Sequence, residues 1–398
     1  MKSSNMLLTV AGFFFINALL YNYFTLVFFS ARYFPFIDLS EHKYSILFIQ
    51  FTYFSLCVLF VFLSFYAKKY CNEKKKIIYV PCFFLLSILA LAALCELALI
   101  PFIDLTPIYT TDAKRGWKLK ANSKGSILGT KYSINAKGVR GKEIDYEPNL
   151  KYRILYLGDS VMFGFMIEKD ANTLPYKIEQ CLGDRGLTVE TINAGVCGYS
   201  PSQEYEYLIN EGIKYHPNLV VVSVVLNDVS DKMFFKNMGD NIVGFELLSQ
   251  KKISSRLELL LQMLYTNKTK RRNYFSVNRE LCDFPQHQKF AQYLEKTFEE
   301  LQKIDLFCKK RSIKTLFVFF PCRYQLTKNT LAISPQKKLQ KEFQYLDLQH
   351  VFFQATLQQQ ISTYYLDFWH PTVQGYQLAA EKITQYLEQE IPSEYFNK

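Results

Sequence analysis

The sequence YRILYLGDS at residues 152–160 decides how the rest of this 398-residue chain is interpreted. Six mostly apolar residues, 152–157, lead directly into Gly158, Asp159 and Ser160. A short apolar run that ends at a glycine-containing turn indicates a buried strand. A serine at such a strand end is a candidate nucleophile. It needs a histidine to accept its proton and an acid to orient that histidine.

The sequence DFWH at residues 367–370 supplies both partners near the carboxyl terminus. Asp367 precedes His370 by three residues, so the two side chains can face each other across one turn. We therefore expect Ser160, His370 and Asp367 to form a catalytic triad.

The region after residue 151 alternates between strand and helix patterns, which predicts a parallel sheet in a three-layer α/β/α domain. We expect strands at 152–157, 188–193, 219–226 and 314–320, and helices at about 172–182, 201–214, 288–310 and 373–389. Ligands of such sheets gather at the carboxyl ends of the strands. Ser160, Gly195 and Asn227 all fall there.

Attack by Ser160 on a carbonyl would produce an oxyanion that needs hydrogen-bond donors. The candidates are the backbone N–H groups of Ser160 and Gly195 and the side-chain amide of Asn227. The missing Cβ of Gly195 would let the substrate oxygen approach the backbone amide.

With these motifs in chain order, the chain resembles the SGNH hydrolases, also called GDSL-type esterases, from about Arg153 to the carboxyl terminus. The resemblance implies a flavodoxin-like domain, Ser160 as nucleophile, Gly195 and Asn227 in the oxyanion hole, and Asp367 with His370 in the triad. The stretches 134–141 (INAKGVRG) and 193–228 look like those of membrane-anchored bacterial members. Two positions depart from the family pattern: Val161 stands where the motif has Leu, and Leu226 where Gly is common.

Three apolar runs at about 6–29, 44–66 and 77–102 predict transmembrane helices. The loop 68–76 is rich in Lys, which predicts a cytoplasmic amino terminus and an extracytoplasmic, periplasmic catalytic domain at a bacterial inner membrane. A cleaved signal peptide is the rival interpretation of the first run. Glu96, in the third run, is either a functional carboxylate or one that pairs with a neighbouring group.

These patterns divide the chain into a membrane region (1–104), a small β lead-in (105–150) and a catalytic domain (151–398) with an insertion at about 230–285, whose role the sequence leaves open. Five cysteines lie outside the membrane region, and buried free thiols are expected for most of them: Cys181, Cys197, Cys282, Cys308 and Cys322.

The net charge of +11 is not accompanied by a nucleic-acid recognition motif, so an anionic lipid or polymer fits it better. No His and Cys cluster with metal spacing is present, and we expect no metal and no cofactor. The expected partners are the lipid bilayer, a membrane partner protein in the case of acyl transfer, and an acylated carbohydrate or lipid ester as substrate.

The sequence thus predicts a membrane-anchored serine esterase that cleaves O-acyl groups, such as acetyl, on a cell-surface or exported glycan, and a lipid ester or thioester fits the same chemistry equally well. Two other functions use the same features. An O-acyltransferase would pass the acyl group from the same triad to a sugar, and a non-catalytic glycan-binding protein would keep only the fold. The acyl group, the acceptor and the oligomeric state are left open.

Overall fold

The computed structural model describes most of the chain beyond residue 107. The described ranges are 108–127, 130–147, 150–229, 277–283, 288–327 and 343–396, with Ser255 and scattered helical positions between 11 and 97. The chain divides into two compact units, one of residues 1–104 with 254–258 and one of residues 105–253 with 259–398. Within the first unit, the Ser255 hydroxyl donates a hydrogen bond of 2.9 Å to the Glu96 carboxylate, so Glu96 pairs with a group from the insertion.

A five-stranded parallel sheet forms the centre of the second unit, with the strand order β6-β5-β7-β8-β9. The strands are β5 (Tyr152–Leu157), β6 (Val189–Asn193), β7 (Leu219–Val224), β8 (Lys314–Phe319) and β9 (Tyr345–Asp347). Every residue of β5, β6 and β7 is buried. Near-continuous burial explains why these strands read as apolar runs, since helices cover both faces of a parallel sheet.

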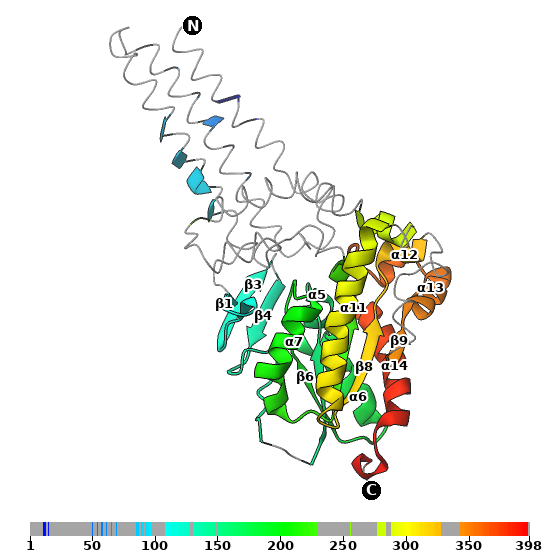
Figure 1. Ribbon diagram of the computed structural model, residues 1–398. Helices are drawn as coiled ribbons and strands as arrows, with labels where there is room; N and C mark the ends of the chain where they lie inside the picture. The colour runs from blue at the N-terminus through cyan, green and yellow to red at the C-terminus, as the bar shows by residue number, and fades with distance from the viewer. Residues whose placement is uncertain are drawn as a thin grey trace. The chain divides into compact units, whose positions relative to one another are not determined.

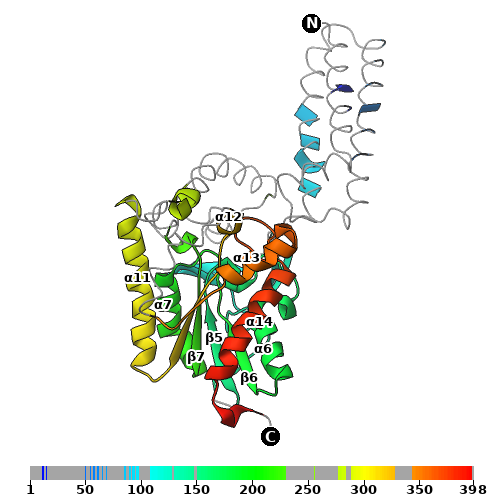
Figure 2. The ribbon, with the colours of Figure 1, turned by 90° about the vertical axis from the view of Figure 1, so that its right-hand side faces the viewer.

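Helices cover the two faces of the sheet in pairs (Figures 1 and 2). One face carries α6 (Leu174–Asp184) against α14 (Val373–Glu390), and the other carries α7 (Pro201–Asn210) against α11 (Gln288–Lys309). The result is the three-layer α/β/α arrangement that the sequence predicts. Shorter helices among the described residues include α5 (Ser160–Phe163), α12 (Arg323–Thr327), α13 (Gln349–Gln358) and single 3₁₀ turns at 170–172, 212–215, 361–363 and 393–395.

The direction in which successive strands are added to the sheet reverses between β5 and β7. From β5 the chain passes through α6 to β6 on one side, and then through α7 back across to β7 on the other side of β5. Sheets of this order hold their ligands at such a switch point, outside the carboxyl ends of the strands. Ser160 follows β5 and Asn227 follows β7, so both candidates flank this point.

The lead-in consists of two antiparallel hairpins, formed by β1 (Tyr109–Asp112) with β2 (Gly116–Leu119), and by β3 (Ser123–Ile127) with β4 (Thr130–Ile134). Its apolar side chains belong to the same buried cluster as Leu155 of β5 and Phe163 of α5. The lead-in therefore packs directly on the sheet and on the helix that follows β5.

The predicted strands at 152–157, 188–193, 219–226 and 314–320 are confirmed to within two residues, and the four predicted helices to within four. The strand β9 and the helix α13 were not predicted. Among the residues that the structure describes, no helix is both long enough and apolar enough to span a bilayer. Most residues of the predicted transmembrane helices at 6–29, 44–66 and 77–102 lie outside the described residues, as does most of the insertion at 230–285.

Replacing Leu155 by alanine should destabilise the second unit by about 2 to 5 kcal/mol, because this fully buried side chain leaves a cavity in the central strand. The measurement is the denaturant midpoint of the full-length protein, followed by tryptophan fluorescence. Leu150→Ala is the matched control, since Leu150 is 93% exposed and its removal should change stability by less than about 0.5 kcal/mol. Equal midpoints for the two variants would contradict the assigned core.

Candidate active site

The turn after β5 is shaped by tight packing and by one carboxylate. A Cβ on Gly158 would lie 2.0 Å from the Ser223 hydroxyl of β7 and 2.7 Å from the Met162 Cβ, so only glycine fits between them. Asp159 is the N-cap of α5, and its Oδ1 accepts a hydrogen bond of 2.9 Å from the Val161 N–H. Ser160 is thereby the first residue of α5, where backbone N–H groups have no acceptor within the helix.

The structure brings Ser160, His370 and Asp367 together in one hydrogen-bonded chain. The Ser160 Oγ lies 2.8 Å from the His370 Nε2, and the His370 Nδ1 lies 2.8 Å from the Asp367 Oδ2. The other oxygen of Asp367 accepts the backbone N–H groups of Trp369 and His370 at 2.8 and 2.9 Å. These backbone bonds fix the carboxylate, and the carboxylate in turn fixes the tautomer of the imidazole with a proton on Nδ1.

The environment sets the protonation of this pair. Burial disfavours the charged form of His370 and is the largest influence, but the charge and hydrogen bond of Asp367, joined by the charge of Asp159, raise the pKa of His370 above 6.5 overall. Burial also opposes ionisation of Asp367, yet its contacts with His370 lower the pKa of this carboxyl from 3.8 to about 2. Asp367 is therefore ionised at neutral pH and can stabilise an imidazolium.

Asp159 also connects the nucleophile turn to the loop after β7. Its Oδ2 accepts a hydrogen bond of 3.1 Å from the Asn227 side-chain nitrogen and lies 3.4 Å from the Ser160 Oγ. Asn227 is 9% exposed and begins the helical residues 227–229. The Asn227 amide carries two hydrogens, of which this bond uses one.

Gly195 lies against the backbone of α5. A Cβ at this position would come within 2.3 Å of the Phe163 nitrogen and 2.7 Å of the Met162 carbonyl carbon. The neighbouring Val196 N–H donates to the Gly158 carbonyl at 3.0 Å. The structure thus gives a different reason for glycine here than the one expected from the sequence, because the missing Cβ makes room for the helix that carries the nucleophile.

The backbone N–H of Gly195 has an acceptor in this state of the protein. It donates to the side-chain oxygen of Asn193 at 3.1 Å. Asn193 ends β6, and its amide nitrogen lies 3.5 Å from the Phe163 carbonyl. The neutral side-chain oxygen of Asn193 therefore accepts the hydrogen bond that the Gly195 N–H would have to give to an oxyanion.

Two residues of the site were missed by sequence reasoning. The ring of Phe165 lies 4.9 Å from the His370 ring, centroid to centroid, at 50°. The hydroxyl of Tyr376, on α14, donates to the Val161 carbonyl at 2.6 Å and joins the last helix to α5. Both depend on contacts between distant parts of the chain, for which one sequence carries no signal.

The three-residue spacing of acid and histidine is not unique to residues 367–370. Asp347 precedes His350 by the same spacing, but its Oδ1 accepts the Gln349 N–H at the start of α13, and His350 is exposed. Contact with Ser160 thus distinguishes His370, and spacing alone would not.

Cys197 is the cysteine nearest to the oxyanion candidates in the sequence, but it is buried and burial raises the pKa of its thiol to about 12. It stays a thiol at neutral pH, which makes it a poor nucleophile. The six described cysteines are free thiols, namely Cys57, Cys181, Cys197, Cys282, Cys308 and Cys322. In the part of the chain that the structure describes, no three His, Cys, Asp or Glu side chains are grouped so as to hold a metal ion.

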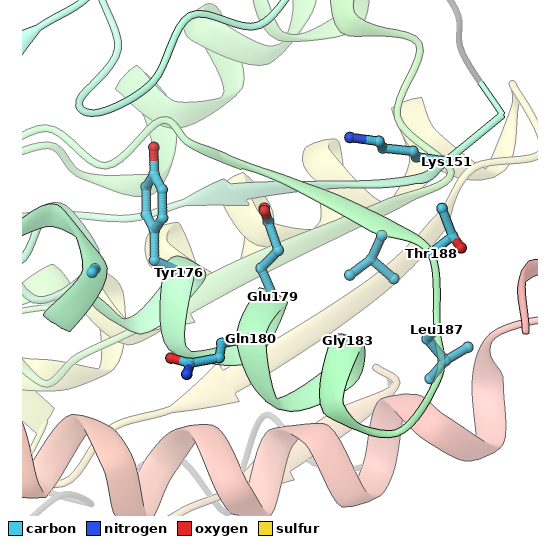
Figure 3. Close-up of a pocket in the computed structure, with 9 residues that line it drawn as sticks. Lys151, Tyr176, Glu179, Gln180, Gly183, Leu187 and Thr188 are labelled. Atoms are coloured by element: carbon cyan, nitrogen blue, oxygen red, sulfur yellow. The ribbon is translucent and has the colours of Figure 1, made fainter. Parts of the chain in front are cut away.

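A surface pocket of about 470 Å³ lies away from this chemistry, at the amino ends of β5 and β6 (Figure 3). Two of its polar side chains, Glu179 and Tyr176, form hydrogen bonds that stabilise the fold. Glu179 accepts the N–H and hydroxyl of Thr191 at 2.8 and 2.7 Å, and the Tyr176 hydroxyl accepts the Lys142 N–H at 2.6 Å. We therefore place the candidate site at Ser160 and not in this pocket.

No family model matches the chain, and no curated protein matches it. Solved structures with a similar arrangement include a GDSL-like lipase from Bacteroides thetaiotaomicron, with 14% identity over 62% of this chain and 93% of that one and a TM-score of 0.36. The acetylxylan esterase Axe2 from Geobacillus stearothermophilus has 13% identity over 59% and 93%, with a TM-score of 0.37. TesA has 12% identity over 60% and 99%, with a TM-score of 0.39.

Gly195→Ala should destabilise the protein by about 1 to 3 kcal/mol, since the new Cβ meets backbone atoms of α5 that no side-chain rotation can move away. Gly183→Ala is the control, because Gly183 lies in the helix α6 with nothing within 4 Å of an added Cβ. This control should be neutral or more stable by about 0.5 to 1 kcal/mol. Denaturant midpoints measure both, and a Gly195→Ala protein as stable as the control would refute the proposed close approach.

Proposed function

We propose that this protein is a serine esterase that hydrolyses O-acyl esters through an acyl-Ser160 intermediate. The observation that carries the proposal is the hydrogen-bonded chain from the Ser160 Oγ through His370 to Asp367, with 2.8 Å at each step. These two hydrogen bonds join a nucleophile to a base, and the base to an acid that orients it.

In the first step, His370 Nε2 takes the Ser160 proton while the Ser160 Oγ attacks the ester carbonyl. The negative charge then moves to the carbonyl oxygen, and Ser160 N–H, Gly195 N–H and the Asn227 amide would stabilise it. The oxyanion would compete with the neutral Asn193 oxygen for the Gly195 N–H. A charged acceptor forms the stronger hydrogen bond and would displace it.

Collapse of this intermediate breaks the ester bond, and the imidazolium of His370 donates its proton to the leaving alcohol oxygen. Water then attacks the acyl-Ser160 carbonyl while His370 Nε2 accepts a proton from it. The second collapse releases the carboxylic acid and returns the proton to the Ser160 Oγ. Throughout, the Asp367 carboxylate holds the Nδ1 proton and offsets the positive charge.

We further propose that the protein is anchored in the cytoplasmic membrane of a bacterium, with the esterase domain on the outer side. Three long apolar runs precede residue 105, and large apolar side chains are exposed at described helical positions within each of them, including Phe15, Phe54, Phe65 and Leu85. Exposed apolar side chains of this size favour contact with lipid. An ester on an exported glycan, or a lipid ester, is the substrate class that this placement favours.

The full-length protein in detergent should react with a fluorophosphonate probe at Ser160, and Ser160→Ala should abolish both the labelling and the hydrolysis of p-nitrophenyl acetate. We expect the loss of kcat to be at least about 10⁴-fold, because no other group replaces the nucleophile. Ser202→Ala, at a partly buried serine on α7, is the control and should keep both activities.

Equal labelling of the Ser160→Ala and wild-type proteins would remove Ser160 as the nucleophile. The fate of the acyl group is measured in the same assay by comparing free acetate with acetylated sugar when a glycan acceptor is added. Faster acetylation of the sugar than release of acetate would identify an acyltransferase in place of the proposed esterase.

Esterase activity should fall as the pH is lowered, because protonated His370 cannot accept the Ser160 proton. The raised pKa of His370 puts the acid limb of kcat/KM above pH 6.5. Asp367→Asn should lower kcat by about 10³- to 10⁴-fold. It should also move this limb to lower pH, since the negative charge that raises the pKa of His370 is lost. Asp184→Asn, at an exposed carboxylate on α6, should leave the profile unchanged. An acid limb well below pH 6.5 in the wild type would contradict the assignment of the base.

A further inference from the structure

Arg140, from the lead-in, is a buried charge placed next to the nucleophile helix. It is 1% exposed and follows the hairpin of β3 and β4 within the sequence KGVRG. Its Nε lies 2.7 Å from an Asp170 carboxylate oxygen, and its two terminal nitrogens donate to the carbonyls of Phe163, Gly164, Ile167 and Glu168. These five acceptors match the five N–H groups of a guanidinium.

The four carbonyls belong to one short segment, residues 163–168, which we call the clamp loop. It leaves α5 immediately after the nucleophile turn, and its backbone has positive φ at Gly164 (81°) and Met166 (63°). A non-glycine residue with positive φ is uncommon and has to be held by its surroundings. A second lead-in group provides such a contact, because the Tyr132 hydroxyl accepts the Met166 N–H at 2.9 Å.

The close approach of Arg140 depends on the glycine in the clamp loop. A Cβ on Gly164 would lie 3.2 Å from an Arg140 terminal nitrogen and 2.7 Å from the Thr173 methyl carbon. The rings of Tyr132 and Phe163 also lie 4.8 and 5.1 Å from the guanidinium carbon. The guanidinium is thus enclosed by planar rings and loop carbonyls, an arrangement that suits arginine and not lysine.

The clamp loop presents Phe165 to the catalytic histidine. The Phe165 ring packs on the His370 imidazole at 4.9 Å, and it is the partly buried side chain between Gly164 and Met166. The charged groups that face His370 are Asp367 on its own loop and Asp159 at the end of β5. Phe165 is therefore an uncharged ring in contact with the imidazole, and such a contact can limit both the access of water and the rotation of His370.

We propose that Arg140 is a positioning residue for catalysis, which acts by fixing the clamp loop so that Phe165 holds and shields His370. This inference rests on the esterase function proposed above. It makes the lead-in part of the working site, although no lead-in residue touches the triad in the contacts described. Misplacement of the base by even 1 Å lowers the rate of the chemical step, so the effect belongs in kcat.

The test compares Arg140→Lys, Phe165→Ala and their double variant in the full-length protein. Each single variant should lower kcat for p-nitrophenyl acetate by about 10- to 100-fold with KM changed less than about twofold. The double variant should be no slower than the slower single variant, because Arg140 acts through Phe165. Additive losses, or a wild-type kcat for Arg140→Lys, would overturn the proposal.

Arg153→Lys is the matched control. Arg153 is also buried, and its guanidinium binds Glu190 and the carbonyls of Tyr146 and Tyr215 at the amino end of β5. It should lower the melting temperature as Arg140→Lys does but keep the wild-type kcat. An equal loss of kcat in Arg153→Lys would show that replacing either buried arginine lowers kcat through the stability of the fold, and would overturn the positioning role of Arg140.

A second readout does not require ester hydrolysis. Because burial lowers the pKa of His370, a displaced Phe165 should raise it, and Phe165→Ala and Arg140→Lys should both move the imidazole titration to higher pH. The measurement is a ¹³C-histidine NMR titration of the full-length protein, with His370 assigned from His370→Asn. Arg153→Lys should leave the titration in place, and an unmoved titration in Arg140→Lys would overturn the inference.

The two proposals fail in different ways. A wild-type protein that neither labels nor hydrolyses esters refutes the esterase function, while the histidine titration still decides the role of Arg140. If Arg140→Lys does not fold, Tyr132→Phe replaces it, since it removes the 2.9 Å bond to the Met166 N–H and keeps the ring. It should shift kcat and the titration in the same directions by a smaller factor, and no shift in either would overturn the proposal.

Discussion

The hydrogen bond between Ser160 and His370 joins side chains that are 210 residues apart in the chain. Ser160 is fixed by β5 and the first turn of α5, whereas His370 lies in the loop before α14, where its carbonyl accepts the Leu366 N–H at 2.8 Å. The Tyr376 hydroxyl then connects α14 to the Val161 carbonyl. The short distance therefore requires that α14 is docked on the sheet, so the proposed nucleophile and its proposed base meet only in the folded domain.

One carboxylate at the end of β5 coordinates the other parts of the site. Asp159 caps α5, holds the Asn227 amide and adds its negative charge to that of Asp367 near the imidazole. These roles are compatible because β5 and β7 are parallel neighbours at the switch point of the sheet, so the loops that follow them begin at the same edge. Asp159 thus orients the Asn227 amide, a proposed oxyanion donor, and its charge raises the pKa of His370.

The sequence predicts the central strands well because β5 and β7 are buried along their whole length and read as apolar runs. It gives no such signal for β9, whose three residues at the sheet edge are only half buried. Local motifs select the three residues of the proposed triad, yet the spacing that selects His370 also occurs at His350, and only three-dimensional contact separates them. Phe165 escaped prediction because its relation to His370 depends on a loop fixed by a remote arginine.

The reason why Gly195 is glycine also had to come from the structure, since the α5 backbone that excludes a Cβ there is brought close only by folding. The same holds for the boundary placed at residue 150. Ile134 and Val139 of the lead-in share a buried cluster with Leu155 of β5 and Phe163 of α5, although the sequence pattern changes sharply between them. A change in periodicity marks a change of local structure and does not by itself mark the limit of a hydrophobic core.

The two buried arginines show how such a core constrains function. Removing the partners of a buried charge is costly, so each guanidinium requires its surrounding carbonyls to stay where they are. Arg153 imposes this requirement at the amino end of β5, far from the chemistry, and Arg140 imposes it on the loop that follows the nucleophile helix. The conformation of the clamp loop is then set by its contacts with Arg140 and not by its own sequence. Any change in the lead-in that moves Arg140 must also move Phe165, and with it the surroundings of the catalytic base.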